Sequence, residues 1–126
     1  MISSEDVQRW LDAYVEAWRS YDEGAIRALF TADATYAYHP YDEPEQGVDA
    51  IVAAWLGDRD EPNTWEASYA PSLIDGNRAI AAGETRYVDR GLTYSNLFEL
   101  EFDDDGRCRR FVEWYMEQPS ADAGEQ

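Results

Sequence analysis

The sequence predicts an α+β fold in which three N-terminal helices pack on a strongly curved, mainly antiparallel sheet, so that the domain has the shape of a cone. Two observations predict this class. Apolar residues recur at helical spacing in the first half of the chain, and from Asn63 onward they alternate with a period of two. The strands predicted by the second pattern are about ten residues long, and antiparallel strands of that length normally curl.

The first helix is predicted at residues 4–20. Ser3 and Asp6 have the spacing of a capping box, and the apolar residues that follow keep to one face of a helix. Asp22 then caps a second, short helix that runs through residues 25–30.

A brief strand is predicted next, at residues 34–38, and it must end before Pro40, which has no N–H for a ladder hydrogen bond. Residues 41–47 carry too much proline, glycine and charge for regular structure, so they are predicted as a loop. A third helix begins at Val48 and closes near Gly57.

Turn signals at residues 75–77, 90–91 and 104–106 divide the rest of the chain into four strands. No internal repeat and no domain boundary interrupts the pattern. The sequence therefore predicts a single domain over residues 1–118, followed by a polar tail at residues 119–126.

Composition excludes several classes of function. The formal net charge of −17 repels phosphate backbones and anionic lipids, so we expect neither nucleic acid nor a membrane as a partner. Every basic residue is Arg, which excludes a lysine nucleophile. With one His and one Cys the usual zinc ligands are lacking, and we expect no metal. The lone Cys108 and an acidic N-terminus without an apolar signal segment predict a cytoplasmic protein.

Short motifs follow one another along nearly the whole chain. They are residues 14–18, 24–30 and 33–35, His39-Pro40, Gly47 with Ile51, and residues 102–107 leading into Glu113-Trp114. Their order resembles the nuclear transport factor 2-like superfamily. The closest resemblance is to its SnoaL-like branch, which is similar to ketosteroid isomerases and limonene-epoxide hydrolases. It implies the cone-shaped fold with a pocket, although this fold serves enzymes and binding modules alike.

The resemblance implies catalytic roles for residues of the first half. Tyr14 falls where ketosteroid isomerases have their oxyanion-hole tyrosine, and a neutral phenol there donates to a carbonyl oxygen that gains charge. The alternative is a core tyrosine bonded to backbone. His39 falls at the general-base position if one extra residue is allowed, and Tyr38 falls there otherwise. An imidazole works as a base near neutral pH, but a structural His39 bonded to a carboxylate such as Glu43 remains an alternative.

Asn96 and Glu113 complete the candidate catalytic set. Asn96 aligns with the oxyanion aspartic acid of the isomerases, yet an amide cannot transfer a proton. Glu113 falls near a carboxylate that epoxide hydrolases use to orient their water or epoxide. If Glu113 faces the pocket, burial raises its pKa and makes it a general acid. If the register slips by one residue, it faces solvent or an interface instead.

The sequence has more indole rings than packing a domain of this size requires (Trp18, Trp55, Trp65 and Trp114), so we expect some of them to form an apolar pocket wall. For Trp18, packing between helix and sheet is the alternative use. The residues assigned to substrate binding are Trp18, Tyr38, Trp55, Tyr87, Phe98, Phe111 and Tyr115.

The predicted function is that of a small SnoaL-like enzyme without a cofactor, acting by proton transfer on a modest, mostly apolar carbonyl compound or epoxide. His39 is the expected base and Glu113 a supporting acid. Tyr14 and Asn96 are the expected hydrogen-bond donors. The alternative is a non-catalytic module of the same fold that binds a small ligand or dimerises. A homodimer is expected through the outer face of the sheet, where Leu97 needs cover.

Overall fold

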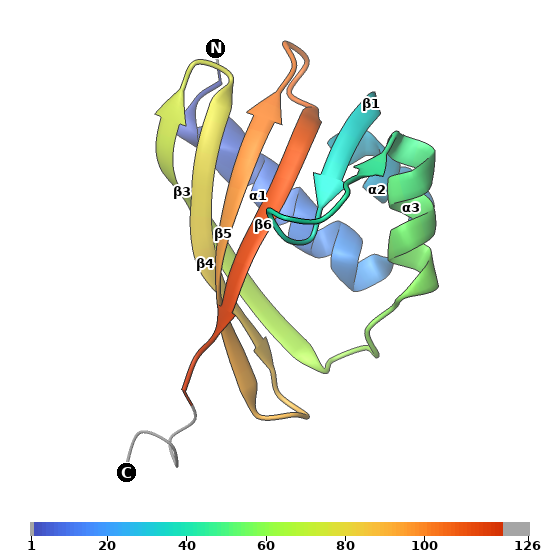
Figure 1. The fold of residues 1–126 in the computed structure, drawn as a ribbon, viewed down its shortest axis with the longest axis vertical. Helices are drawn as coiled ribbons and strands as arrows, with labels where there is room; N and C mark the ends of the chain where they lie inside the picture. Colours follow the sequence, from blue (N-terminus) through green and yellow to red (C-terminus); the bar gives the residue numbers. More distant parts are fainter. Residues whose placement is uncertain (1, 120–126) are drawn as a thin grey trace.

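The structure, a computed structural model, describes residues 2–119. Figure 1 shows α1 crossing behind a curved sheet, with α2 and α3 beside β1, which confirms the cone-shaped α+β fold. All but the first residue of the predicted polar tail lies outside the described residues. The elements are α1 (Ser4–Ser20), α2 (Glu23–Leu29), β1 (Phe30–Ala37), β2 (Glu45–Gln46), α3 (Val48–Gly57), β3 (Trp65–Asp75), β4 (Arg78–Tyr87), β5 (Leu92–Phe102) and β6 (Cys108–Glu117).

Helix α1 begins at the predicted residue because its capping box forms. The Ser3 Oγ accepts a hydrogen bond from the Asp6 backbone N–H, and the Asp6 carboxylate accepts one from the Ser3 backbone N–H, both at 3.1 Å. At the other end Tyr21 takes a left-handed backbone conformation, and its N–H bonds to the carbonyl oxygen of Ala17. The residues that α1 buries are Val7, Trp10, Leu11, Tyr14 and Ala17.

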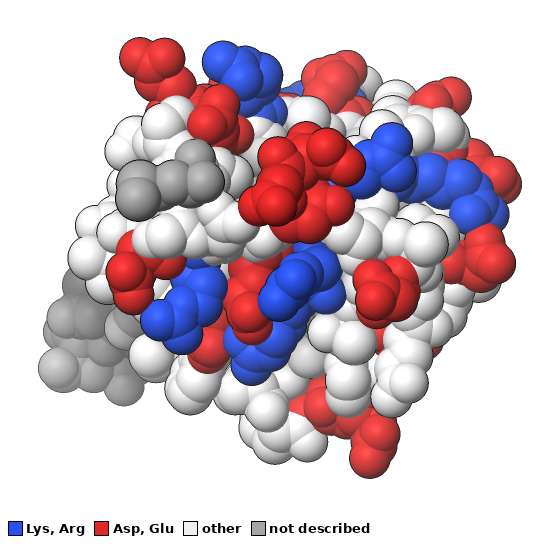
Figure 2. Space-filling view, turned by 90° about the horizontal axis from the view of Figure 1, so that it is seen from above, with Lys and Arg blue, Asp and Glu red and all other residues white. Residues whose placement is uncertain are grey.

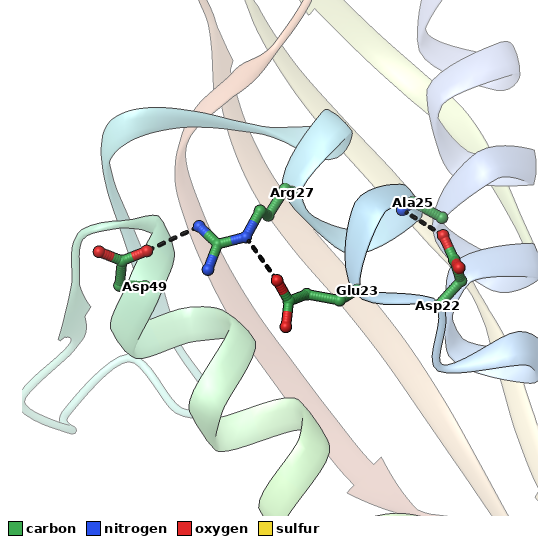
Figure 3. Close-up of polar contacts among 5 residues, drawn as sticks. All are labelled: Asp22, Glu23, Ala25, Arg27 and Asp49. Atoms are coloured by element: carbon green, nitrogen blue, oxygen red, sulfur yellow. Dashed lines mark hydrogen bonds and ion pairs between the residues drawn. The ribbon is translucent and has the colours of Figure 1, made fainter.

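Helix α2 is capped by Asp22, whose carboxylate accepts a hydrogen bond from the Ala25 backbone N–H at 2.8 Å (Figure 3). Arg27 on the same helix donates to Glu23 at 3.1 Å and to Asp49 of α3 at 2.6 Å. Both ion pairs are exposed and add little to stability, and the pair with Asp49 links α2 to α3.

The β1 region differs from its prediction in two ways. β1 begins at Phe30, four residues before the predicted strand, because it pairs in parallel with β6 from that point. The segment predicted as a loop contains β2, which pairs antiparallel with β1 through Thr35 and Tyr36. The prediction that residues 41–47 form an entirely irregular loop was therefore wrong. The early start of β1 comes from pairing with β6, and the short strand β2 comes from pairing with β1; local composition reports neither pairing.

The strand order in the sheet is β2-β1-β6-β5-β4-β3. The four long strands pair antiparallel with their sequence neighbours, and their turns lie at the predicted positions. Register shifts after Pro71 in β3 and after Glu101 in β5 add to the curl of the sheet. The curled face on the side of α1 is the one that carries Asn96, as period two predicts.

Gly83 in β4 allows the closest approach between two strands. A Cβ atom on this residue would lie 1.9 Å from the carbonyl oxygen of Ser68 and 2.8 Å from the Cα of Tyr69. Any larger residue would therefore push β3 away. Gly83 faces Tyr69 across the β3–β4 pair and Asn96 across the β4–β5 pair, so it lies between two residues of the cavity described below.

The core is filled by aromatic side chains between α1 and the sheet. Phe30, Phe98, Phe102 and Phe111 are all fully buried. Cys108 is buried beside them, and burial raises the pKa of its thiol to about 12, so it stays protonated.

Acidic side chains and arginines alternate over the surface. Figure 2 shows this at the end of the molecule that is uppermost in Figure 1. Several of the pairs, such as Arg9 with Asp6 and Arg78 with Asp75, are exposed and contribute little to stability. Within residues 2–119, none of the helices combines the length and the apolar character that crossing a membrane requires.

Candidate active site

A cavity of about 460 Å³ lies between the curled face of the sheet, α1 and the end of α3. This volume is in the range of sites that hold small organic molecules. Its wall combines α1, β1, α3 and all four long strands, so residues from both halves of the chain meet there.

Tyrosine dominates the wall of the cavity. Eight of the nine tyrosines line it, whereas Tyr41 lies outside. Trp18 and Trp55 add two indole rings. A tyrosine offers a ligand both an apolar ring face and a hydroxyl group. The wall is therefore aromatic, but it is more polar than the mostly apolar pocket that the sequence predicts.

A chain of hydrogen bonds crosses the four long strands on the cavity side. The hydroxyl groups of Tyr69 and Thr85 lie 2.5 Å apart, and the Thr85 hydroxyl donates to Asn96 Oδ1 at 3.0 Å. Because the single hydroxyl hydrogen of Thr85 is used in that bond, Tyr69 must donate to Thr85. Asn96 Nδ2 then donates to Glu113 Oε2 at 2.8 Å. All three hydrogens point along the chain towards the Glu113 carboxyl group.

Glu113 has an environment that brings its protonation change close to neutral pH. Burial raises its pKa from the ordinary value of 4.5 to about 7, against the Asn96 hydrogen bond and the nearby charge of His39, which lower it. Glu113 faces the cavity, so the inward register is the observed one. A carboxyl group with such a pKa takes up and releases protons readily at neutral pH.

Tyr14 and Tyr36 form a pair of phenols in the same wall, with their hydroxyl oxygens 2.9 Å apart. Burial first, and then the charge of Glu113, raises the pKa of Tyr14 well above its usual value. Burial also raises the pKa of Tyr36, so both side chains stay neutral donors. When one hydroxyl donates to the other, the second hydrogen is available to a ligand oxygen. The Tyr14 hydroxyl thus bonds to a side chain rather than to backbone.

The mouth of the cavity is held by contacts between three segments. Trp18 stacks on Trp65 at a centroid distance of 3.6 Å, and its Nε1 donates to Asp60 at 2.9 Å. The Tyr21 hydroxyl accepts from the Asp60 backbone N–H at 2.8 Å. Arg90, in the β4–β5 turn, lies over the Tyr87 ring. Trp18 therefore packs between α1 and the sheet and also lines the cavity.

His39 does not line the cavity, and its predicted position as a base in the pocket is wrong. β1 ends at Ala37, so His39 lies in the following loop. Its Nδ1 is 2.7 Å from Asp42 Oδ2, and its Nε2 is 2.8 Å from the Tyr115 hydroxyl. The carboxylate partner is Asp42 and not Glu43. His39 reaches the wall only through that contact with Tyr115, whereas the alternative residue at this position, Tyr38, does line the cavity.

Phe98 and Phe111 are also misplaced by the sequence prediction, because they lie behind the wall and not in it. Phe111 stacks on Tyr36 at 4.3 Å and on Tyr14 at 5.5 Å between ring centroids. Phe98 packs against Tyr14 and Tyr69. The tyrosine rings separate both phenylalanines from the cavity. The other predicted site residues do line it: Tyr14, Trp18, Tyr38, Trp55, Tyr87, Asn96, Glu113 and Tyr115.

The wall also contains residues that the sequence prediction did not assign to the site. Tyr36 is two residues from Tyr38, and Tyr94 is two residues from Asn96. The alternation of a strand therefore indicates that Tyr36 and Tyr94 face the cavity as well. Thr85 and Tyr69 lie on neighbouring strands, and only the register brings their hydroxyl groups together.

A second and larger hollow, of about 630 Å³, runs along α1 from Asp6 to Ala17, against α2 and the turns that follow β3 and β5. We call it the groove. Its lining includes the buried residues Trp10 and Leu29, and its rim carries acidic residues including Asp103–Asp105. Asn77 Nδ2 donates to Asp104 Oδ1 at 3.1 Å in an exposed bond on this rim.

The cavity is suited to two kinds of chemistry. The raised pKa of Glu113 is suited to proton exchange, and the pair of Tyr14 and Tyr36 has one hydroxyl hydrogen that can be donated to an oxygen atom. Over residues 2–119 no three side chains of His, Cys, Asp or Glu gather closely enough to hold a metal ion.

Three helices on a curled sheet with a cavity on its covered face define a nuclear transport factor 2-like protein. The model of the SnoaL-like domain matches residues 11–111, and the chain belongs to this family.

Solved structures of similar fold agree with this assignment. A proposed polyketide cyclase from Sinorhizobium meliloti is 21% identical, with a TM-score of 0.67 over 90% of this chain and 100% of that one. An NTF2-like protein of unknown function from Burkholderia xenovorans is 20% identical, with a TM-score of 0.72 over 93% and 88%. A proposed ketosteroid isomerase from Kribbella flavida is 18% identical, with a TM-score of 0.69 over 91% and 81%. At these identities the likeness shows the fold. Comparison with curated proteins gives no match.

Proposed function

We propose that the chain is a small enzyme that transfers protons, without a cofactor, on a modest, mostly apolar carbonyl compound bound in the cavity. The observation that carries the proposal is Glu113, which ends a directed hydrogen-bond chain in a wall that also presents the Tyr14–Tyr36 pair. The similar fold of a proposed ketosteroid isomerase and a proposed polyketide cyclase supports the proposal.

Glu113 is the proposed base. Its carboxylate removes a proton from the carbon next to the carbonyl group, and the electrons of that C–H bond move towards the carbonyl oxygen. The negative charge that develops there is stabilised by the Tyr14 hydroxyl, which is free to donate to the substrate when Tyr36 donates to Tyr14. Return of the proton from Glu113 to another atom of the substrate completes an isomerisation.

Asn96 has a supporting role in this proposal. Its amide donates to one carboxyl oxygen of Glu113 and leaves the other free for the substrate. Ring opening of an epoxide would require an acid at such a position, and an amide cannot supply the proton. A carbonyl compound is therefore favoured over an epoxide.

The proposal is tested with 2-tetralone, an apolar bicyclic ketone with acidic α-protons, dissolved in D₂O. Loss of the α-proton signals in the NMR spectrum measures proton removal without any knowledge of the natural product. We expect the wild-type chain to accelerate the loss, and Glu113→Gln to lower the enzymatic rate by about 10²- to 10⁴-fold.

The matched control is Glu66→Gln, the same substitution at an exposed position of β3, where it should leave the rate unchanged. Wild-type protein that gives no acceleration with 2-tetralone or with smaller cyclic ketones would refute the proposal and favour the binding module.

We also propose that the chain forms a homodimer through the outer face of the sheet. Leu97 and Trp114 face each other across β5 and β6 and are exposed, as is Met116. Apolar side chains gathered in this way are a common basis of dimer contacts. Sedimentation at about 0.15 M salt should give twice the monomer mass of 14.4 kDa for the wild type and a monomer for Leu97→Glu. A wild-type monomer at micromolar concentration contradicts the dimer.

A further inference from the structure

A second hydrogen-bonded chain of titratable groups reaches the cavity from the outside. Asp42, His39 and Tyr115 are linked by contacts of 2.7 Å and 2.8 Å, and the Tyr115 side chain lines the cavity. The first two residues belong to the loop after β1 and the third to β6, 76 positions from His39. Neither helix nor strand periodicity requires these groups to meet.

The imidazole is held in one orientation. Its ring stacks on Tyr41 at 5.0 Å and lies 4.9 Å from the ring of Tyr115. The backbone N–H of Asp42 donates to the His39 carbonyl oxygen at 3.1 Å, which tightens the turn between them. An ionised carboxylate only accepts hydrogen bonds, so Nδ1 of His39 carries a hydrogen and Nε2 faces the Tyr115 hydroxyl.

We propose that Tyr115 is a second acid–base group of the cavity, positioned and reprotonated by His39 and Asp42, and that the substrates are carbonyl compounds with a β-hydroxyl group, from which the enzyme eliminates water. This inference rests on the proposed function, in which Glu113 removes the α-proton. Tyr115 is the catalytic residue in it, and His39 and Asp42 act through Tyr115.

Each atom of the elimination has a partner in the site. Glu113 takes the α-proton, and the electrons of the C–H bond form the carbon–carbon double bond. The bond from the β-carbon to its hydroxyl breaks, and the leaving oxygen takes the Tyr115 hydroxyl proton and departs as water. Protonated His39 returns a proton from Nε2 to the phenolate, with its own charge balanced by Asp42. Glu113 has gained one proton and His39 has lost one, and exchange with water restores both.

The two groups are suitably spaced for this reaction. Glu113 and Tyr115 are two positions apart on β6 and lie on the same face of the strand, so their Cα atoms are roughly 7 Å apart. Both side chains extend from that face into the same cavity. Burial, and next the Glu113 charge, raises the pKa of Tyr115, which keeps the phenol protonated and able to donate. The side chain of His39 is 30% exposed, which opens the far end of the chain to water.

The test compares two compounds in the same variants. 2-Tetralone has one oxygen and measures α-proton removal alone. 4-Hydroxy-4-phenylbutan-2-one has a β-hydroxyl group, and its elimination to 4-phenylbut-3-en-2-one is followed by ultraviolet absorbance. In Tyr115→Phe and His39→Gln we expect the ratio of elimination to α-proton exchange to fall by about 10²-fold. The control Tyr41→Phe, the same substitution on the other neighbour of His39, should keep the ratio.

The outcomes separate the two proposals. Equal loss of both reactions in Tyr115→Phe and His39→Gln would mean that these residues only hold the loop, which overturns the inference. Wild-type protein that exchanges 2-tetralone without eliminating water also overturns it, while leaving the proposed function in place. Wild-type protein with neither reaction refutes the proposed function itself.

A second measurement does not depend on turnover. His39 is the only histidine, so its ring nitrogen signals are assigned directly in a ¹⁵N NMR spectrum. Tyr115→Phe should move the Nε2 signal, because the hydroxyl partner is lost, and Tyr41→Phe should not remove that partner. An Nε2 signal that is the same in Tyr115→Phe and wild type would show that the contact is not made in solution and would overturn the inference.

Discussion

Each of the two hollows of the molecule contains an asparagine amide that donates to a carboxyl group, but the surroundings of the two pairs differ. In the groove, Asn77 donates to Asp104 at 3.1 Å in a solvent-exposed bond. In the cavity, Asn96 donates to Glu113 at 2.8 Å, and the amide is 7% exposed. The groove is the larger of the two, at about 630 Å³ against about 460 Å³. The candidate site is therefore not distinguished by its size. It is distinguished by the burial of its carboxyl group, because burial moves the pKa of that group into the pH range where it can transfer protons.

The largest expected effect concerns the pH dependence of stability. The pKa of Glu113 is about 7 in the folded chain and near 4.5 otherwise, so between these values the folded state holds a proton that the unfolded state releases. Stability from this residue is thus present at low pH and is lost as the pH rises through that window. At pH values above this window, ionised Glu113 lowers the free energy of unfolding by roughly 3 kcal/mol. Glu113→Gln cannot ionise and avoids this loss. Urea unfolding should show the variant gaining stability over wild type as the pH rises. A constant difference would mean that Glu113 is in contact with water.

A smaller effect compares the two asparagines directly. Asn96→Ala removes the acceptor of the Thr85 hydroxyl and the donor to the Glu113 carboxyl group, so the free energy of unfolding should fall by about 1–3 kcal/mol. Asn77→Ala removes an exposed bond and should cost less than about 0.5 kcal/mol. Denaturant titration of both variants measures the difference. Equal losses would mean that the hydrogen bond in the cavity is no more withdrawn from water than the one in the groove.

The smallest effect concerns the acidic rim of the groove. The chain has 27 acidic and ten basic residues, and their repulsion is screened within about 10 Å at 0.1 M salt. The melting temperature of the wild type should therefore rise with added NaCl. Asp105→Asn, which removes one charge of the rim, should raise it slightly at low salt and not at about 0.5 M. Melting curves that do not respond to salt would mean that the acids are already paired.

The helices and long strands could be predicted because their signals are local. A capping box at Ser3 and Asp6 sets the start of α1, and Gly76 takes the positive φ that the β3–β4 turn requires. β2 and the early start of β1 could not be predicted. The start of β1 depends on pairing with β6, far along the chain, and β2 depends on pairing with β1. The residues involved have no local preference that would predict either pairing.

The site was predictable where a residue's orientation follows from its own element. Tyr14 on a helical stripe and Asn96 on a strand face both line the cavity. His39 was not predictable, because a loop conformation and its contact with Tyr115 decide where its ring lies. The bond between Tyr69 and Thr85 was missed for a related reason: it needs the register of two strands, which neither strand's sequence contains.

The close approach at Gly83 limits how this site can change over evolution. The two strands meet there backbone against backbone, beside Tyr69 and opposite Asn96, so exchanging core side chains cannot relax that contact. The inner end of the cavity is therefore resistant to single substitutions. Tyr87 and Tyr94 are half-buried residues of the wall and have no such constraint on their side chains. New substrates in related chains should accordingly be accommodated by changes at the rim, with the proton-transfer groups below it retained.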